Sequence, residues 1–89
     1  SCWNRGMEDI AFVAGEKFLL EKSPHRSSDA TRLWVRKEAL GKAIGVGVED
    51  FVLANSVIKS PVEVQNKFYY IENLKAPTGY FAAMSISVI

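Results

Sequence analysis

A regular alternation of apolar and polar side chains near the carboxyl-terminal end constrains the fold of this 89-residue chain more than any other feature. Within 62–71 the even positions are mostly apolar, namely Val62, Val64, Phe68 and Tyr70. A second alternation covers 80–89, and the turn-forming residues Pro-Thr-Gly at 77–79 precede it. Because successive side chains of a strand point to opposite faces, both stretches are predicted to be half-buried strands that pair antiparallel.

Two shorter apolar runs, 9–14 and 17–22, lie on either side of Gly-Glu at 15–16. We interpret them as two strands joined by a tight turn. The polar segment 23–30 that follows is predicted to be a loop. In this mainly β arrangement the side chains expected to be buried are Phe12, Leu20, Val64, Phe68, Ile86 and Val88.

The segment 31–44 fits two different periods. As a strand, 31–37 would alternate between a polar and an apolar side, whereas in a helix Leu33 and Leu40 would lie on one face. A glycine at Gly41 would cost a helix about 1 kcal/mol relative to alanine, so we favour the strand. The predicted fold is therefore a small antiparallel β-barrel or roll. The alternative is an α+β fold with one helix near 31–44 packed on a sheet.

Composition limits the class of protein. Hydrophobic residues make up 48% of the chain, which is enough for one globular domain spanning 1–89. The net charge of +1 provides no general attraction to nucleic acid, which makes a nucleic-acid partner an unfavourable hypothesis. No run approaches the roughly 20 apolar residues of a membrane span. The single cysteine, Cys2, rules out an intramolecular disulfide and is compatible with the cytosol without establishing a compartment.

No pattern of catalytic or metal-ligating residues stands out in the sequence. His25 is the only histidine and lies in the polar segment, where neighbours in sequence rarely meet in the geometry of a catalytic triad. Together with Cys2 it is too little for a zinc site. Glu49 and Asp50 are adjacent and would point to opposite faces of a strand. We therefore expect no enzyme activity, no metal and no cofactor.

The residues Glu-Asp-Ile-Ala-Phe-Val-Ala-Gly-Glu at 8–16 resemble the acidic loop and diverging turn of Src-homology-3 domains. Trp34 falls where that family has its peptide-binding tryptophan, and Phe51 falls where its closing segment has a tyrosine. The resemblance covers 8–53. The opening aromatic strand of the family is missing, and Val48 stands in place of its groove proline.

This resemblance implies a non-catalytic module that binds a peptide or protein through an aromatic and acidic patch. Tyr69 joins the patch because it lies on the polar side of its predicted strand, and tyrosine is enriched at binding hot spots. The predicted partner-binding residues are Trp34, Phe51, Glu8, Asp9, Glu16 and Tyr69. The alternative is a structural subunit of a viral, phage or other oligomeric assembly that pairs through its C-terminal strand, with a homo-oligomer as one possible form.

Overall fold

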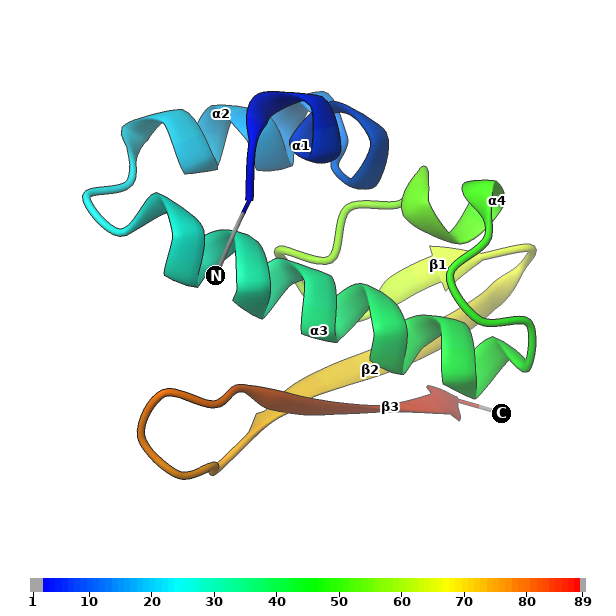
Figure 1. Ribbon diagram of the computed structural model, residues 1–89. Coiled ribbons are helices and arrows are strands. Elements are labelled where there is room, and N and C mark those ends of the chain that lie inside the picture. Colours follow the sequence, from blue (N-terminus) through cyan, green and yellow to red (C-terminus); the bar gives the residue numbers. More distant parts are fainter. Residues whose placement is uncertain (1–2, 89) are drawn as a thin grey trace.

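The computed structural model describes residues 3–88, which form four helices and three strands (Figure 1). The helices are α1 (Arg5–Ala11), α2 (Ala14–Lys22), α3 (Arg26–Ile44) and α4 (Asp50–Leu53). The strands are β1 (Val62–Val64), β2 (Lys67–Leu74) and β3 (Ala82–Val88). The long helix α3 lies between the sheet on one side and α1 and α2 on the other (Figure 1).

The sheet is open, so the predicted β-barrel or roll is wrong. Its strands run in the order β1-β2-β3, and β1 and β3 are its two edges within residues 3–88. Strand β3 occupies most of the stretch predicted as strand 80–89 and pairs with β2, with Tyr70 opposite Ile86. The antiparallel pairing expected there is confirmed. The fold is α+β, with helices that supply most of the chain's regular structure.

The two strands predicted over 9–14 and 17–22 are wrong, since these residues belong mainly to α1 and α2. Asn4 begins α1 because its side-chain oxygen accepts a hydrogen bond from the Met7 N–H at 2.9 Å, as an N-cap residue does. Val13 has extended backbone angles and separates the two helices. A break of two residues between short helices therefore replaces the expected hairpin turn.

Exposed apolar side chains account for this error. Ile10 and Phe18 are 77% and 64% exposed, whereas Phe12 and Leu20 are buried as expected. The helices thus carry more apolar residues than they bury, and the surplus conceals the helical period. The polar segment 23–30 is also not all loop, because α3 occupies its second half.

Helix α3 includes the strand predicted over 31–37, so that prediction is wrong as well. Its buried residues Ala30, Leu33, Lys37 and Leu40 recur three or four positions apart, and Ala39 and Gly41 are buried on either side of Leu40. Residues with this spacing lie on one face of a helix, and this face packs against the core. The polar residues of α3 lie around the rest of its surface. In the sequence their spacing resembles that of the polar side of a strand.

Gly41 lies within α3 because the chain returns closely against it. The N–H groups of Gly45, Val46 and Gly47 all lie within hydrogen-bonding distance of the Gly41 carbonyl oxygen, at 2.9, 3.2 and 3.1 Å. Gly45 ends the helix in the left-handed region with φ 95°. A Cβ on Gly41 would lie 2.2 Å from the Gly47 carbonyl oxygen. Gly41, whose helix propensity favoured a strand in the sequence analysis, is thus required because the loop after α3 packs against it.

The stretch 62–71 is two strands rather than one. Gln65 and Asn66 both have positive φ values, 52° and 69°, and form a two-residue turn that pairs Val64 with Lys67. Two consecutive residues with positive φ are typical of the tight hairpin turns that match the twist of antiparallel strands. The turn reverses the direction of the chain. The alternation of buried and exposed side chains in β1 therefore does not continue in phase into β2.

This turn changes which side chains of β2 and β3 are buried. Tyr69 and Ile71 face the core, whereas Phe68 and Ile86 are 48% and 55% exposed. The prediction that Phe68 and Ile86 are buried is therefore wrong, and the side chain of Val88 lies outside the described residues. The outer face of the sheet, opposite α3, carries exposed apolar side chains.

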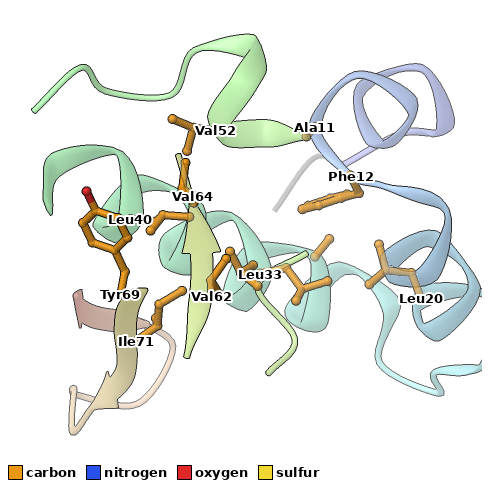
Figure 2. Close-up of a cluster of buried hydrophobic side chains, with 12 residues drawn as sticks. Ala11, Phe12, Leu20, Leu33, Leu40, Val52, Val62, Val64, Tyr69 and Ile71 are labelled. Carbon is orange, nitrogen blue, oxygen red and sulfur yellow. The ribbon is translucent and has the colours of Figure 1, made fainter. Parts of the chain in front are cut away.

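One apolar core joins the two sides of α3 (Figure 2). Figure 2 shows the sheet residues Val62, Val64 and Ile71 on one side of Leu33. On the other side lie Phe12, which follows α1, and Leu20 of α2. Within residues 3–88, none of the helices combines the length and the apolar character needed to cross a membrane.

Candidate active site on helix α3

A fully buried ion pair lies on the core-facing side of α3. The Lys37 Nζ is 2.7 Å from the Glu16 Oε1, and neither side chain has any exposed surface. Lys37 also donates to the carbonyl oxygens of Leu53 and Asn55, at 2.6 and 2.7 Å. With three acceptors, the ammonium group has a partner for each of its donors.

Glu16 is equally well satisfied. Its Oε1 accepts a hydrogen bond from the Val13 N–H at 3.0 Å, and its Oε2 accepts one from the Val57 N–H at 2.8 Å. Burial lowers the pKa of Lys37, and the hydrogen bond to Glu16 opposes that shift. The network therefore joins the beginning of α2, the middle of α3 and the segment 53–57. Because its charged side chains are fully buried, a substrate cannot reach them.

A second ion pair joins α1 to the beginning of α3. The Arg26 guanidinium donates to both carboxylate oxygens of the buried Glu8, with Nε at 3.0 Å from Oε2 and Nη2 at 2.5 Å from Oε1. The hydrogen bond from Arg26 is the largest cause of the lowered pKa of Glu8. Because the pairing uses both oxygens, Glu8 serves to hold the two helices together.

Aromatic residues and an apolar cavity lie on the α1 side of α3. The ring of Trp3 is 5.2 Å from that of Phe12 and 5.9 Å from that of Trp34. The Trp3 indole N–H donates to the Thr31 hydroxyl at 3.1 Å, which anchors the ring to α3. Beside these rings lies an open cavity of about 350 Å³, lined by Trp3, Met7, Ile10, Ala11, Trp34 and Leu53.

Glu38 and Lys42 carry opposite charges on the exposed side of α3. They are one helical turn apart, and both side chains are exposed. Trp34, four residues before Glu38, extends the same line along the helix toward the apolar cavity. No ion pair involves Glu38 or Lys42 within the described part of the chain. The arrangement presents a carboxylate and an ammonium group side by side to solvent.

The predicted partner-binding residues do not form one surface. Glu8, Glu16 and Tyr69 are buried, and the first two carboxylates are bound within the molecule. Asp9 is exposed and pairs with Lys17 at 3.2 Å. The three acids of the predicted acidic patch thus belong to three separate ion pairs.

The two aromatic members of that predicted patch are half-buried. Trp34 packs against the core beside Trp3, and Phe51 packs against the core from α4. The charged pair Glu38 and Lys42 was missed by the sequence reasoning. Its spacing of four residues is the signal that could have indicated it, had the helical alternative for this segment been followed.

A family model described as the 4'-phosphopantetheinyl transferase superfamily matches residues 4–84. The chain belongs to this superfamily. The match begins at the N-cap residue of α1 and reaches into β3, so it includes the buried ion pairs and the charged pair of α3. No significant similarity to a curated protein or to a solved structure is found.

Membership in the phosphopantetheinyl transferase superfamily overturns the resemblance to Src-homology-3 domains. The superfamily is one of enzymes, so the predictions of a non-catalytic binding module and of an assembly subunit are wrong, as is the expectation of no enzyme activity. The resemblance failed because its acidic and glycine residues at 8–16 form two helices and a buried network instead of a strand, a loop and a turn.

Phosphopantetheinyl transferases act on a phosphate group, and phosphate chemistry often uses a divalent cation held by carboxylates. Within residues 3–88, no three side chains of His, Cys, Asp or Glu come together closely enough to hold a metal ion. Glu38 therefore belongs to no such group of three within these residues.

Proposed function

We propose that this chain takes part in the transfer of a 4'-phosphopantetheinyl group to a hydroxyl group of a carrier protein. The observation that carries the proposal is the superfamily match over residues 4–84, which spans all four helices. The superfamily acts on carrier proteins, so a protein partner for this chain is expected. The donor is a pyrophosphate ester of phosphopantetheine, such as coenzyme A.

The transfer is a displacement at phosphorus. The acceptor hydroxyl oxygen forms a bond to phosphorus, the bond from phosphorus to the bridging oxygen breaks, and the electron pair leaves with the nucleotide phosphate. The hydroxyl loses its proton, and negative charge spreads over the phosphoryl oxygens. Catalysis therefore needs a carboxylate or similar base near the hydroxyl and a positive charge near the phosphate.

Glu38 and Lys42 can supply these two functions. We assign the Glu38 carboxylate to the acceptor proton and the Lys42 ammonium to the phosphoryl oxygens. Side chains one turn apart on a helix have Cβ atoms about 5–6 Å apart, which leaves room for a phosphoryl group between their ends. The buried pair of Lys37 and Glu16 fixes the rotation of α3 and thereby the direction in which Glu38 points.

The apolar cavity next to Trp34 supports the same assignment. It continues the line of the charged pair toward α1, so an apolar surface and a charged surface meet on one side of α3. Phosphopantetheinyl transfer uses both kinds of surface, because the charged surface can bind the phosphate group and the apolar surface can bind the folded carrier protein. We infer that apolar side chains of the carrier protein contact Met7 and Ile10, which are exposed at this cavity.

Intact-protein mass spectrometry of a carrier protein tests the proposed function. The full-length protein is incubated with coenzyme A and an unmodified carrier protein. The proposal predicts an increase in carrier mass equal to one phosphopantetheinyl group. A carrier variant in which the acceptor serine is alanine should gain none. The proposal would be contradicted if several wild-type carrier proteins all kept their mass unchanged in the presence of every divalent cation supplied.

A further inference from the structure

A cavity between α3 and the loop that joins β2 to β3 lies away from the charged pair of α3. It has a volume of about 550 Å³ and is open to solvent. One wall is formed by Ser28, Arg32 and Val35 of α3, and the other by residues 73–82, which include the loop between β2 and β3. This volume falls in the range of roughly 300–1,000 Å³ that is usual for small-molecule sites.

The charges that line this cavity are all positive. Arg32 and Lys75 approach it from different elements, and no aspartate or glutamate is among its lining residues. Neither of the nearby carboxylates lines this cavity. Asp29 accepts a hydrogen bond from the Ser23 hydroxyl and lines a neighbouring cavity that Arg32 also borders, and Glu72 lines another cavity, on the outer face of the sheet. The cavity therefore attracts an anion.

The guanidinium of Arg32 is oriented by an aromatic ring. Its central carbon lies 4.8 Å from the centre of the Phe81 ring. Stacking of this kind holds the plane of the guanidinium and leaves the N–H groups on its edge available. No hydrogen bond from Arg32 to another residue is formed within residues 3–88. A planar fork of unused donors matches the oxygens of a phosphate group.

The rest of the lining is suited to a flat ring. Tyr80 is 72% exposed and lies in the same loop as Pro77, and both line the cavity. An aromatic side chain this exposed offers a face on which a nucleic-acid base can stack. Phosphate-binding groups and a stacking surface thus occur in one cavity. Together they match a ligand that carries a phosphate next to a ring system.

We propose that this cavity binds a nucleoside phosphate, with its phosphate held by Arg32 and Lys75 and its base placed against Tyr80. The site is separate from the proposed catalytic pair. Arg32 precedes Glu38 by six residues, which at 3.6 residues per turn places it about 240° around α3. The proposal does not rest on the transferase function, since it depends only on the lining of this cavity.

Titration calorimetry of the purified chain with AMP tests the site. AMP should bind saturably, whereas adenosine, which has no phosphate, should bind far more weakly. Arg32→Gln and Lys75→Gln should each weaken AMP binding by about tenfold or more, the usual effect of losing a charged hydrogen bond. Lys59→Gln is the matched control, because Lys59 is an exposed lysine outside the cavity and its loss should leave AMP binding unchanged.

Ribose 5-phosphate separates the two halves of the proposed ligand. Tyr80→Ala should weaken the binding of AMP and leave the weaker binding of ribose 5-phosphate unchanged. Circular dichroism melts of each variant establish that it is folded. The proposal is overturned if AMP does not saturate, if adenosine binds as well as AMP, or if Lys59→Gln weakens AMP as much as Arg32→Gln does.

Discussion

The Lys37 ammonium lies 2.7 Å from the Glu16 carboxylate, and both side chains are completely buried. Burying two charges costs several kcal/mol for each ion, and only a complete set of hydrogen bonds offsets that cost. The set is complete here, since backbone groups of Val13, Leu53, Asn55 and Val57 bind the pair. The pair therefore sets the position of α3 relative to α2 and to the segment after α4.

Removal of one member of this pair should destabilise the protein strongly. Lys37→Met leaves the Glu16 carboxylate buried without its cation, so we expect a loss of about 3–5 kcal/mol in the free energy of unfolding. Urea denaturation measures this loss. The double variant Lys37→Met with Glu16→Leu should be less destabilised than the sum of the two single variants. A single-variant loss below about 1 kcal/mol would show that the pair is not buried as described.

The pair of Glu8 and Arg26 should make stability depend on acid pH. The pKa of Glu8 in the folded protein is below its ordinary value of 4.5, chiefly because Arg26 donates to it. Between these two pKa values the unfolded chain binds more protons than the folded chain. The stability contributed by Glu8 is thus full above pH 4.5 and is lost as the pH falls through the lowered value.

Glu8→Gln checks this pH dependence. The free energy of unfolding of the wild type should decline more steeply below pH 4.5 than that of the variant. Glu63→Gln, at an exposed glutamate of β1, should keep the wild-type slope. Equal slopes for wild type and Glu8→Gln would contradict the assigned role of Glu8.

Two glycines in helices should respond to alanine in opposite directions. Gly41→Ala would place a Cβ 2.2 Å from the Gly47 carbonyl oxygen, so the loop must move and we expect a loss of about 1–3 kcal/mol. Gly15 has open space around the same position, and Gly15→Ala should stabilise α2 by about 0.5–1 kcal/mol. Denaturant midpoints of the two variants measure the difference. Stabilisation by Gly41→Ala would refute the close approach.

The hairpin turn at 65–66 predicts which residues of β2 matter for stability. Ile71→Ala removes a buried side chain and should cost about 2–5 kcal/mol. Phe68→Ala alters a side chain that is about half exposed and should cost markedly less, even though phenylalanine is the larger residue. Thermal or urea unfolding compares the two variants. A larger loss for Phe68→Ala would mean that the opposite face of β2 is buried.

These residues also show how far the sequence allows the fold to be predicted. The strands near the carboxyl-terminal end were recognised because their alternation has a period of two. The face of β2 was assigned wrongly because Gln65 and Asn66, with no glycine, do not form a recognisable hairpin signal. The short helices α1 and α2 were missed because exposed Ile10 and Phe18 hide the helical period.

The site was harder to predict than the fold. Glu16 and Lys37 are 21 positions apart, and no local pattern indicates that their charges meet in the core. Glu16 was therefore assigned to a partner-binding patch. Glu38 and Lys42 become neighbours only if the segment is helical, and the cost assigned to Gly41 favoured a strand. The decisive contact between Gly41 and the Gly47 backbone is tertiary and leaves no signal in a single sequence.

The transfer rate of Glu38→Gln compared with that of Glu63→Gln tests the central claim most directly. Both variants remove an exposed carboxylate, but only Glu38 lies on α3 beside Lys42. Phosphopantetheinylation of a carrier protein by the full-length protein is followed by mass spectrometry. We predict that Glu38→Gln lowers kcat by about 100-fold or more, as expected for loss of a general base, while Glu63→Gln transfers at the wild-type rate. Equal transfer rates for wild type and Glu38→Gln would contradict the assignment of α3 as the active site.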